Sequence, residues 1–250
     1  VNQYETDGMI ELLKEAGMTA VSFEEKADVY LINTCSVTNM ADKKSRQMIH
    51  RAKKLNPDAV VIAAGCYVQA AKDKLMEDDR ISIIIGNNKK KDIVQILEDY
   101  LQSGVTDEGM LDIAAEKEYE PLTINSTLEH TRAYVKIQDG CNQFCSYCII
   151  PYVRGRIRSR DIASITEEVE RLAQTGVKEI VLTGIHISSY GKDKENEVGL
   201  ADAIDAVSKI KSIKRIRLGS LEPGIITDAF INRIVDNEKV CPHFHLSLQS

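Results

Sequence analysis

Residues 133–148 read AYVKIQDGCNQFCSYC, and this stretch decides the fold of the chain. The apolar pattern from Ala133 to Ile137 predicts a strand, and three cysteines follow it at the spacing C-x3-C-x2-C. Three clustered thiolates suit a cubane iron–sulfur cluster, since each binds one iron and one iron stays open to a substrate or cofactor. The alternatives are cysteines packed in a core, or a zinc knuckle completed by a distant ligand such as His130. Structural zinc, however, usually takes two separated pairs of ligands.

The cysteine loop resembles the signature of the radical S-adenosylmethionine enzymes. Cys141, Cys145 and Cys148 have the spacing of that family, and Tyr147 supplies the aromatic residue expected just before the third cysteine. The resemblance implies a 4Fe-4S cluster on these three cysteines, whose open iron chelates the amino and carboxylate groups of S-adenosylmethionine. It also implies that an electron from the cluster cleaves the sulfonium of this cofactor.

The flanking segments resemble one branch of that family, the methylthiotransferases. The resemblance is carried by Lys136-Ile-Gln-Asp-Gly-Cys141, the run from Cys148 to Arg160, Asn33-Thr-Cys35-Ser and Ala64-Gly-Cys66-Tyr. Within the branch, these segments are most similar to the tRNA enzymes that act on N6-threonylcarbamoyladenosine. The resemblance implies that a methylthio group is added to C2 of this base next to the anticodon. One S-adenosylmethionine then serves as methyl donor, and another yields a 5′-deoxyadenosyl radical.

The first hundred residues alternate between helical and strand patterns. Apolar runs at 29–33, 59–64 and 81–85 predict strands separated by helices. This alternation predicts a parallel sheet covered on both faces, in a domain over residues 1–103. Cys35 and Cys66 each follow the carboxyl end of a strand, the edge at which parallel sheets bind ligands. We therefore expect the two cysteines to meet there, and buried cysteines without a metal are the alternative.

The resemblance implies that Cys35 and Cys66 hold an auxiliary 4Fe-4S cluster. In the family pattern, a third cysteine lies two residues before the match to Val1. The chain also opens without Met and without the strand expected before its first helix. We therefore expect that the N-terminus is cut away and that the auxiliary cluster lacks one ligand in this chain.

Residues 130–250 predict an incomplete barrel. Strand patterns at 133–137, 178–182, 215–218 and 244–248 alternate with helices, the first opened by a capping box at Ser164-Ile-Thr-Glu167. A radical S-adenosylmethionine barrel has six such units. The sequence thus predicts an α/β fold, with a parallel-sheet N-terminal domain before a partial barrel of (βα)6 type that is truncated at its C-terminus. Residues 104–129 are rich in acids and predict a solvated linker.

The loops after the barrel strands carry candidate cofactor ligands. In a barrel of parallel strands, the active site lies at the carboxyl face. Similar segments in the family contact the amino group, ribose or adenine of S-adenosylmethionine, and an ordinary turn is the alternative for each. The candidates are, with Tyr147, the residues Gly184 and His186 after the second strand, Ser220 and Glu222 after the third, and Gln249 after the fourth.

Positive charge is concentrated locally. The net charge of −6 argues against a general nucleic-acid binder. Arg154, Arg156, Arg158 and Arg160, however, alternate with Gly155, Ile157 and Ser159 after the cysteines. In an extended chain these arginines point one way along a groove, which suits binding of RNA phosphates beside the cluster. Ion pairs with acids inside the barrel are the alternative.

The whole chain has the composition of a soluble globular protein, and we expect it in the cytoplasm. No apolar run approaches the ~18 residues of a membrane helix, and six clustered cysteines suit a reducing compartment. The resemblance implies tRNA, a reducing electron donor and a sulfur donor as partners. The alternatives are a sister enzyme acting on isopentenyladenosine or on an aspartate of a ribosomal protein, a radical enzyme of different chemistry, and a structural zinc-binding module for RNA. Iron with acid-labile sulfide separates the enzymes from the zinc module.

Overall fold

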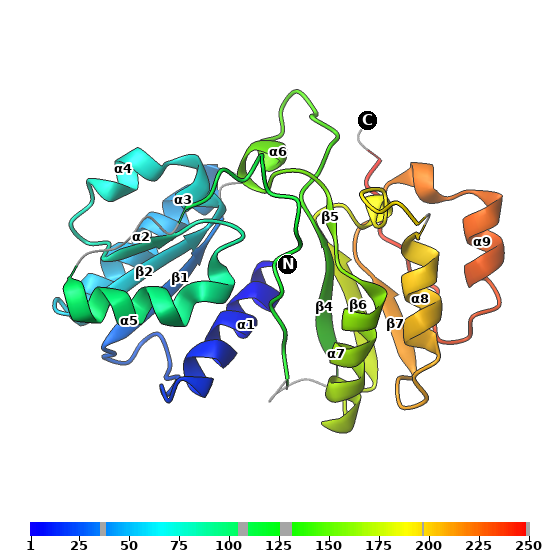
Figure 1. Cartoon of the computed structure of the whole chain (residues 1–250), viewed down its shortest axis with the longest axis horizontal. Coiled ribbons are helices and arrows are strands. Elements are labelled where there is room, and N and C mark those ends of the chain that lie inside the picture. The colour runs from blue at the N-terminus through cyan, green and yellow to red at the C-terminus, as the bar shows by residue number, and fades with distance from the viewer. Residues whose placement is uncertain (36–38, 105–109, 126–131, 197, 249–250) are drawn as a thin grey trace.

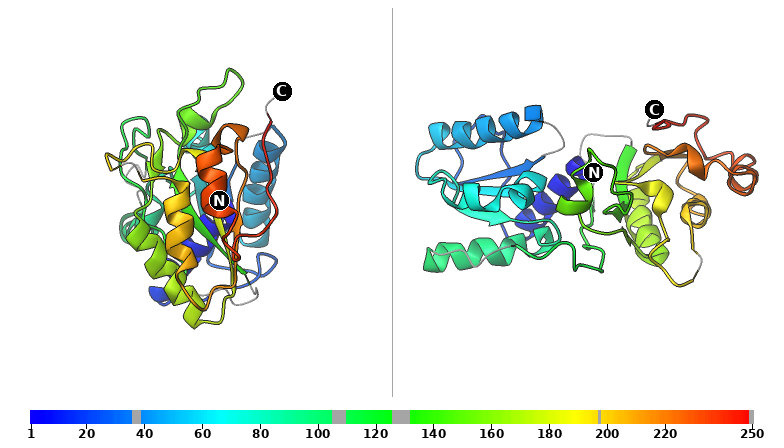
Figure 2. Two further views of the ribbon diagram at one scale, coloured as in Figure 1. Left: turned by 90° about the vertical axis from the view of Figure 1, so that its right-hand side faces the viewer. Right: turned by 90° about the horizontal axis from the view of Figure 1, so that it is seen from above.

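The computed structural model describes residues 1–35, 39–104, 110–125, 132–196 and 198–248 of the 250-residue chain. Two halves lie side by side, each built on its own β-sheet, and helix α1 (Asn2–Glu15) lies between them (Figure 1). The view from above in Figure 2 shows the same division. Both the N-terminal sheet domain and the second, curled sheet confirm the α/β fold class predicted from the sequence.

The N-terminal half is a parallel sheet with strand order β1-β2-β3. β-branched residues such as Val61 and Ile62 favour the strand conformation, and they alternate between the two faces of the sheet. Ile62 packs with α1 and α5, whereas Val61 packs with α2. After α1, the elements are β1 (Val29–Thr34), α2 (Asn39–Leu55), β2 (Val60–Gly65), α3 (Cys66–Ala70), α4 (Lys72–Met76), β3 (Ile83–Ile85), the 3-10 helix η1 (Lys90–Asp92) and α5 (Ile93–Ser103).

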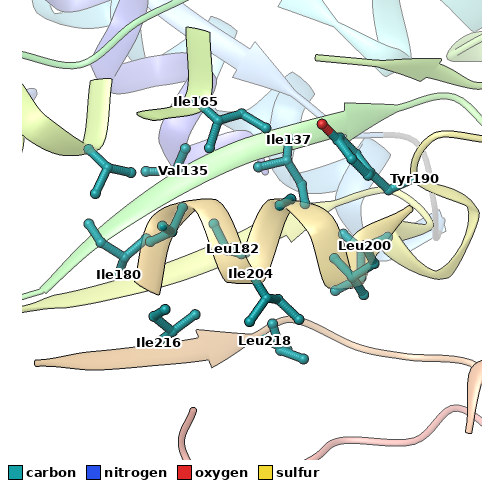
Figure 3. Packing of buried hydrophobic residues seen from close by; sticks show 14 of the residues in the cluster. Val135, Ile137, Ile165, Ile180, Leu182, Tyr190, Leu200, Ile204, Ile216 and Leu218 are labelled. Carbon is teal, nitrogen blue, oxygen red and sulfur yellow. The ribbon is translucent and has the colours of Figure 1, made fainter. Parts of the chain in front are cut away.

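The second half has the strand order β5-β4-β6-β7, in which β4, β6 and β7 are parallel and β5 is antiparallel to β4. Figure 3 shows how inward-facing residues of the strands, such as Ile137 and Leu182, meet Ile165 and Ile204 of the helices. The elements are β4 (Arg132–Asp139), α6 (Ile150–Val153), β5 (Arg158–Ser159), α7 (Ile162–Gln174), β6 (Glu179–Gly184), η2 (Ile187–Ser189), α8 (Leu200–Ser208), β7 (Arg215–Leu218), η3 (Pro223–Ile225) and α9 (Asp228–Ile234).

Two predicted elements of this half are wrong. Residues 244–248 do not extend the sheet as a strand, and only an isolated bridge joins Leu246 to Leu221. Both Phe244 and Leu248 are exposed, so this segment lacks the covering layer that buries the other strands. Helix α7 begins at Ile162, which places Ser164 inside the helix, where its Oγ accepts a hydrogen bond from Arg160 instead of capping the first turn.

The acidic segment is not merely a solvated linker. Over residues 110–125, Ile113, Leu122 and Ile124 are buried, and the last two belong to the core of the second half. Helix α1 contributes to both halves, because Tyr4 packs in that core while Met9 packs against the first sheet. The sequence did not indicate these apolar contacts, because acidic residues stand among the apolar residues of this segment. The chain therefore joins its halves through packed structure.

Candidate functional site

The cysteine loop, Cys141–Cys148, follows β4 at the carboxyl edge of the second sheet. Gly140 makes the turn between them. Its φ is +71°, and a Cβ atom there would lie 1.8 Å from the carbonyl oxygen of Arg156, so only glycine fits. Cys145 is exposed, Cys141 and Cys148 are partly exposed, and all three are free thiols. The loop thus offers three sulfur ligands at an accessible edge of the sheet.

A cleft of about 750 Å³ lies beside the cysteine loop, and residues that follow β6 and β7 line it. Gln143 of the loop donates from Nε2 to Oε2 of Glu222 over 3.3 Å. His186 Nε2 lies 2.9 Å from the same oxygen, although the two are not aligned for a hydrogen bond, and its Nδ1 contacts Ser189 Oγ. A carboxylate, an imidazole and an amide therefore meet at one wall of the cleft, and a role in cofactor binding stays a prediction for His186 and Glu222.

Gln138 joins the start of the cysteine loop to the loop after β6. Its Nε2 donates to the carbonyl oxygens of Asp139 and Gly140, both over 2.7 Å, and its Oε1 accepts from the backbone N–H of His186 over 2.7 Å. At Gly184, a Cβ atom would lie 2.8 Å from the carbonyl oxygen of Gln138. Gly184 therefore permits the close approach of the two loops. Sequence reasoning missed Gln138, whose only signal was a polar residue in a strand pattern.

The other predicted cofactor residues do not line this wall. Tyr147 is 75% exposed, and Ser220 Oγ lies 2.8 Å from His245 Nδ1 in a polar pair. Gln249 lies outside the described residues. A role in cofactor binding stays a prediction for all three.

The structure contradicts the predicted groove of four aligned arginines. Arg154, Arg158 and Arg160 are buried, and only Arg156 is exposed. The run does not stay extended, because a turn at Gly155, with φ of +71°, separates α6 from the two-residue strand β5. The three buried side chains bind carboxylates or backbone carbonyls of the chain itself, so RNA phosphates cannot reach them in this structure.

These arginines have specific partners. Arg160 forms an ion pair with Glu168 and donates to Tyr4 Oη over 3.2 Å. Arg158 donates from Nη1 to the carbonyl oxygens of Arg154 and Arg156, over 2.9 and 3.1 Å. Arg156 instead lies over the ring of Phe144, with 4.4 Å from Cζ to the ring centroid. The run thus holds the cysteine loop on its scaffold through its buried members and leaves one cation on the surface.

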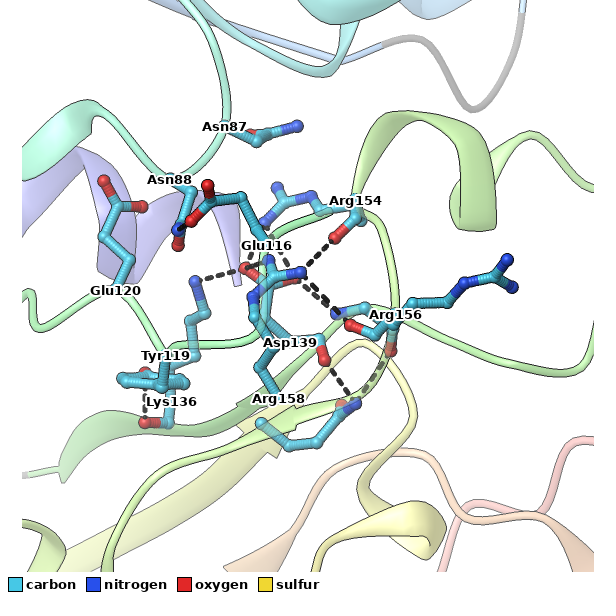
Figure 4. A network of polar contacts seen from close by, with 12 residues as sticks. Asn87, Asn88, Glu116, Tyr119, Glu120, Lys136, Asp139, Arg154, Arg156 and Arg158 are labelled. Atoms are coloured by element: carbon cyan, nitrogen blue, oxygen red, sulfur yellow. Dashed lines mark hydrogen bonds and ion pairs between the residues drawn. The ribbon is translucent and has the colours of Figure 1, made fainter. Parts of the chain in front are cut away.

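A buried charge cluster, consisting of Glu5, Lys90, Lys136, Asp139 and Arg154, lies where the two halves meet (Figure 4). Glu5 accepts from Lys90 and Lys136, both over 2.7 Å, and from Arg154 Nη2 over 3.1 Å. Asp139 lies 2.7 Å from Lys136 and 3.2 Å from Arg154. Burial alone would raise the pKa of Glu5, but the Arg154, Lys136 and Lys90 cations outweigh it and hold that pKa well below its ordinary value.

Cys35 and Cys66 lie at the carboxyl edge of the first sheet. The parallel register pairs Thr34 with Gly65, so the two cysteines directly follow paired residues on neighbouring strands, as the sequence predicted. Gly65 has a φ of +98°, and a Cβ atom there would lie 2.7 Å from the carbonyl oxygen of Thr34. Cys66 is buried, and Arg154 donates to its Sγ from Nε over 3.1 Å. This edge therefore faces the arginine that follows the cysteine loop.

Two families match the chain along most of its length. Residues 1–86 match the family described as uncharacterized protein family UPF0004, and residues 135–250 match the radical SAM superfamily. The threonylcarbamoyladenosine tRNA methylthiotransferase MtaB of Bacillus subtilis is 40% identical over 252 residues, covering 100% of this chain and 55% of that protein. The chain belongs to the radical S-adenosylmethionine methylthiotransferase family.

Another relative of the chain is named for a different product. The tRNA-2-methylthio-N(6)-dimethylallyladenosine synthase of Natranaerobius thermophilus is 33% identical over 261 residues, covering 100% of this chain and 56% of that protein. The radical S-adenosylmethionine methyltransferase TsrM of Kitasatospora setae, solved with tryptophan and a cofactor analogue, has a TM-score of 0.66 over 98% of this chain and 56% of its own. At 15% identity, this likeness shows the fold alone. The chain spans little more than half the length of these proteins.

The methylthiotransferase family uses a 4Fe-4S cluster and S-adenosylmethionine, and the cysteine loop has a donor set that fits them. Three free thiols lie in one loop beside a polar cleft. Among the residues that the structure describes, no group of three His, Cys, Asp or Glu side chains is arranged as a metal site. Burial raises the pKa of the Cys141 thiol, and cluster binding has to displace this proton. None of the described helices is long and apolar enough to cross a membrane.

Proposed function

We propose that this methylthiotransferase adds a methylthio group to C2 of N6-threonylcarbamoyladenosine next to the tRNA anticodon. The observation that carries the proposal is the 40% identity over the whole chain to an enzyme named for that modification, together with the accessible cysteine loop beside the cleft. When bound, the cluster and S-adenosylmethionine supply the radical chemistry at C2. The residues of the chain bind and orient the cofactor, and they exclude water around the reacting base.

The wall formed by Gln143, His186 and Glu222 is proposed to orient S-adenosylmethionine. Its carboxylate and imidazole lie within 2.9 Å of one another, and such a pair can fix a charged amino group or ribose hydroxyls by charge-assisted hydrogen bonds. Tyr147 is proposed to stack on the adenine from the cysteine loop. Ser220 and Gln249 complete the proposed cofactor contacts from the loops after the later strands.

Cys35 and Cys66 are proposed to hold the auxiliary 4Fe-4S cluster that supplies sulfur, together with a third ligand. The shared edge of β1 and β2 supports this assignment, since it places both thiols at the carboxyl ends of neighbouring strands. A sulfur donor and a reducing electron donor complete the proposed partners. Failure of Cys35 and Cys66 to bind iron in the full-length protein would contradict the assignment.

The surface near the cysteine loop is proposed to contact an unpaired loop of tRNA. Arg156 is exposed and stacked on Phe144, while Tyr152 contacts the same ring edge-on, at 5.8 Å between centroids. Aromatic rings and guanidinium planes stack on unpaired bases, and an exposed arginine can bind a phosphate. An anticodon loop presents both kinds of group.

Nucleoside mass spectrometry tests the proposed substrate. In cells that lack the full-length gene, 2-methylthio-N6-threonylcarbamoyladenosine should disappear from tRNA and be replaced by the unmethylthiolated nucleoside. The wild-type gene should restore it, whereas a gene carrying Cys145→Ala should not. Loss of the methylthio group from isopentenyladenosine instead would favour the activity for which the relative that is 33% identical is named. If both tRNA nucleosides keep their methylthio groups and the aspartate of the ribosomal protein loses its own, the enzyme is instead the methylthiotransferase that acts on that aspartate.

A further inference from the structure

Arg154 is the link between the two cysteine sites. It lies six residues after Cys148 in the sequence, yet its Nε donates to Sγ of Cys66 over 3.1 Å. Its remaining nitrogens bind Glu5, Asp139 and Asn2, and the side chain is completely buried. One guanidinium therefore connects the loop of the second half, helix α1 and a cysteine of the first half.

Asn87 gives Cys66 a second, weaker donor. Its Nδ2 lies 3.6 Å from Sγ of Cys66 and donates to the carbonyl oxygen of Val153 over 2.6 Å. Its Oδ1 accepts from Lys90 over 2.7 Å. Figure 4 shows Asn87 near Arg154 of the buried charge cluster. Two N–H donors, one from each half of the chain, thus converge on a single buried sulfur.

We propose that Arg154 is a positioning residue that raises the reduction potential of the iron–sulfur centre ligated by Cys66. The inference rests on the proposed auxiliary cluster at Cys35 and Cys66. Reduction adds negative charge to a cluster and its sulfur ligands, and N–H donors stabilise the more negative state. Because Arg154 and Cys66 are both buried, water screens this interaction little. The fold itself therefore sets the potential of the centre from the neighbouring domain.

A purely structural role for Arg154 makes a different prediction. The guanidinium also neutralises Glu5 and Asp139, and that task requires positive charge alone. Lysine at this position keeps the charge but loses the Nε–H donor to sulfur. Arg154→Lys therefore separates tuning of the cluster from the balance of buried charge.

The test uses the full-length protein with Cys141, Cys145 and Cys148 replaced by Ala, so that only the auxiliary centre is observed. After anaerobic reconstitution, the reduced fraction of this centre is followed by electron paramagnetic resonance as the solution potential is lowered. At the wild-type midpoint, we expect Arg154→Lys to lower the ratio of reduced to oxidised centre several-fold. Arg160→Lys is the matched control, because it is the same substitution at a buried arginine whose hydrogen bonds go to Ser164, Tyr4 and Glu168 rather than to Cys66.

A second variant keeps the inference testable where Arg154→Lys does not fold. Asn87→Leu keeps the branched shape of the side chain and removes the weaker donor, so it should shift the midpoint in the same direction by a smaller amount. Unchanged midpoints in the folded variants, or an equal shift in Arg160→Lys, would overturn the inference and leave the proposed function intact. Absence of iron at Cys35 and Cys66 in the starting protein would overturn both the inference and the proposed auxiliary cluster.

Discussion

The two cysteine sites of the chain differ in how deeply their sulfur atoms are buried and in how many hydrogen bonds those atoms receive. Cys66 is 2% exposed and receives two N–H donors, whereas Cys145 is exposed and Cys141 and Cys148 are partly exposed. The neighbouring arginines differ in the same way, since Arg154 is buried among carboxylates and Arg156 lies on the surface. The surroundings of Cys66, with the buried charge cluster beside it, form the enclosed site of the chain, and the cysteine loop forms its open site.

The largest expected effect is at the open site. Cys145→Ala in the full-length protein should abolish reductive cleavage of S-adenosylmethionine to 5′-deoxyadenosine, because two thiolates cannot hold a cluster that needs three. The product is measured by chromatography after anaerobic reconstitution. Cys241→Ala is the control, since Cys241 lies apart from both sites on the segment after α9. Cleavage by Cys145→Ala at the wild-type rate would refute the assignment of the cysteine loop.

At the enclosed site, the expected effect is on stability. Glu5→Gln should lower the free energy of unfolding by about 3–5 kcal/mol, because Lys90, Lys136 and Arg154 would keep their charges without this carboxylate. Urea denaturation measures this change. Glu98→Gln on the exposed side of α5 is the matched control and should change stability by less than about 0.5 kcal/mol.

The same carboxylate should give the stability a dependence on pH. The pKa of Glu5 in the folded protein lies well below its ordinary value of 4.5, which unfolding restores. Its stabilising contribution is therefore complete above pH 4.5 and is lost as the pH falls through the folded pKa. Asp139 has a lowered pKa as well: burial would raise it, but Lys136 and Arg154 outweigh this. Unfolding measured at falling pH should show a shallower loss in Glu5→Gln, and equal slopes would contradict the role of Glu5.

The sequence predicted features that depend on neighbours in the chain or on regular strand periodicity. The parallel sheet follows from its apolar runs, and the placement of Cys35 and Cys66 after paired residues of neighbouring strands follows from their positions after two such runs. The burial of Arg154 could not be predicted in this way, because its partner Glu5 is 149 residues distant in the sequence. A local pattern of alternating arginines contains no information about which distant acid will fold against it. The link between Arg154 and Cys66 was missed for the same reason.

The smallest expected effect concerns the exposed arginine. Arg156→Gln in the full-length protein should weaken binding similarly for different tRNAs, because a phosphate contact does not read sequence. Loss of one such contact should flatten the log–log dependence of affinity on salt by about 0.7–0.9. Thermal stability should stay unchanged, in contrast to substitutions in the buried charge cluster. Arg132→Gln is the matched control, as Arg132 is also exposed but lies at the opposite end of β4 from the cysteine loop. An unchanged salt slope in Arg156→Gln, or an equal flattening in Arg132→Gln, would show that RNA does not bind at the cysteine loop through Arg156. The open site must then recognise its substrate through other residues.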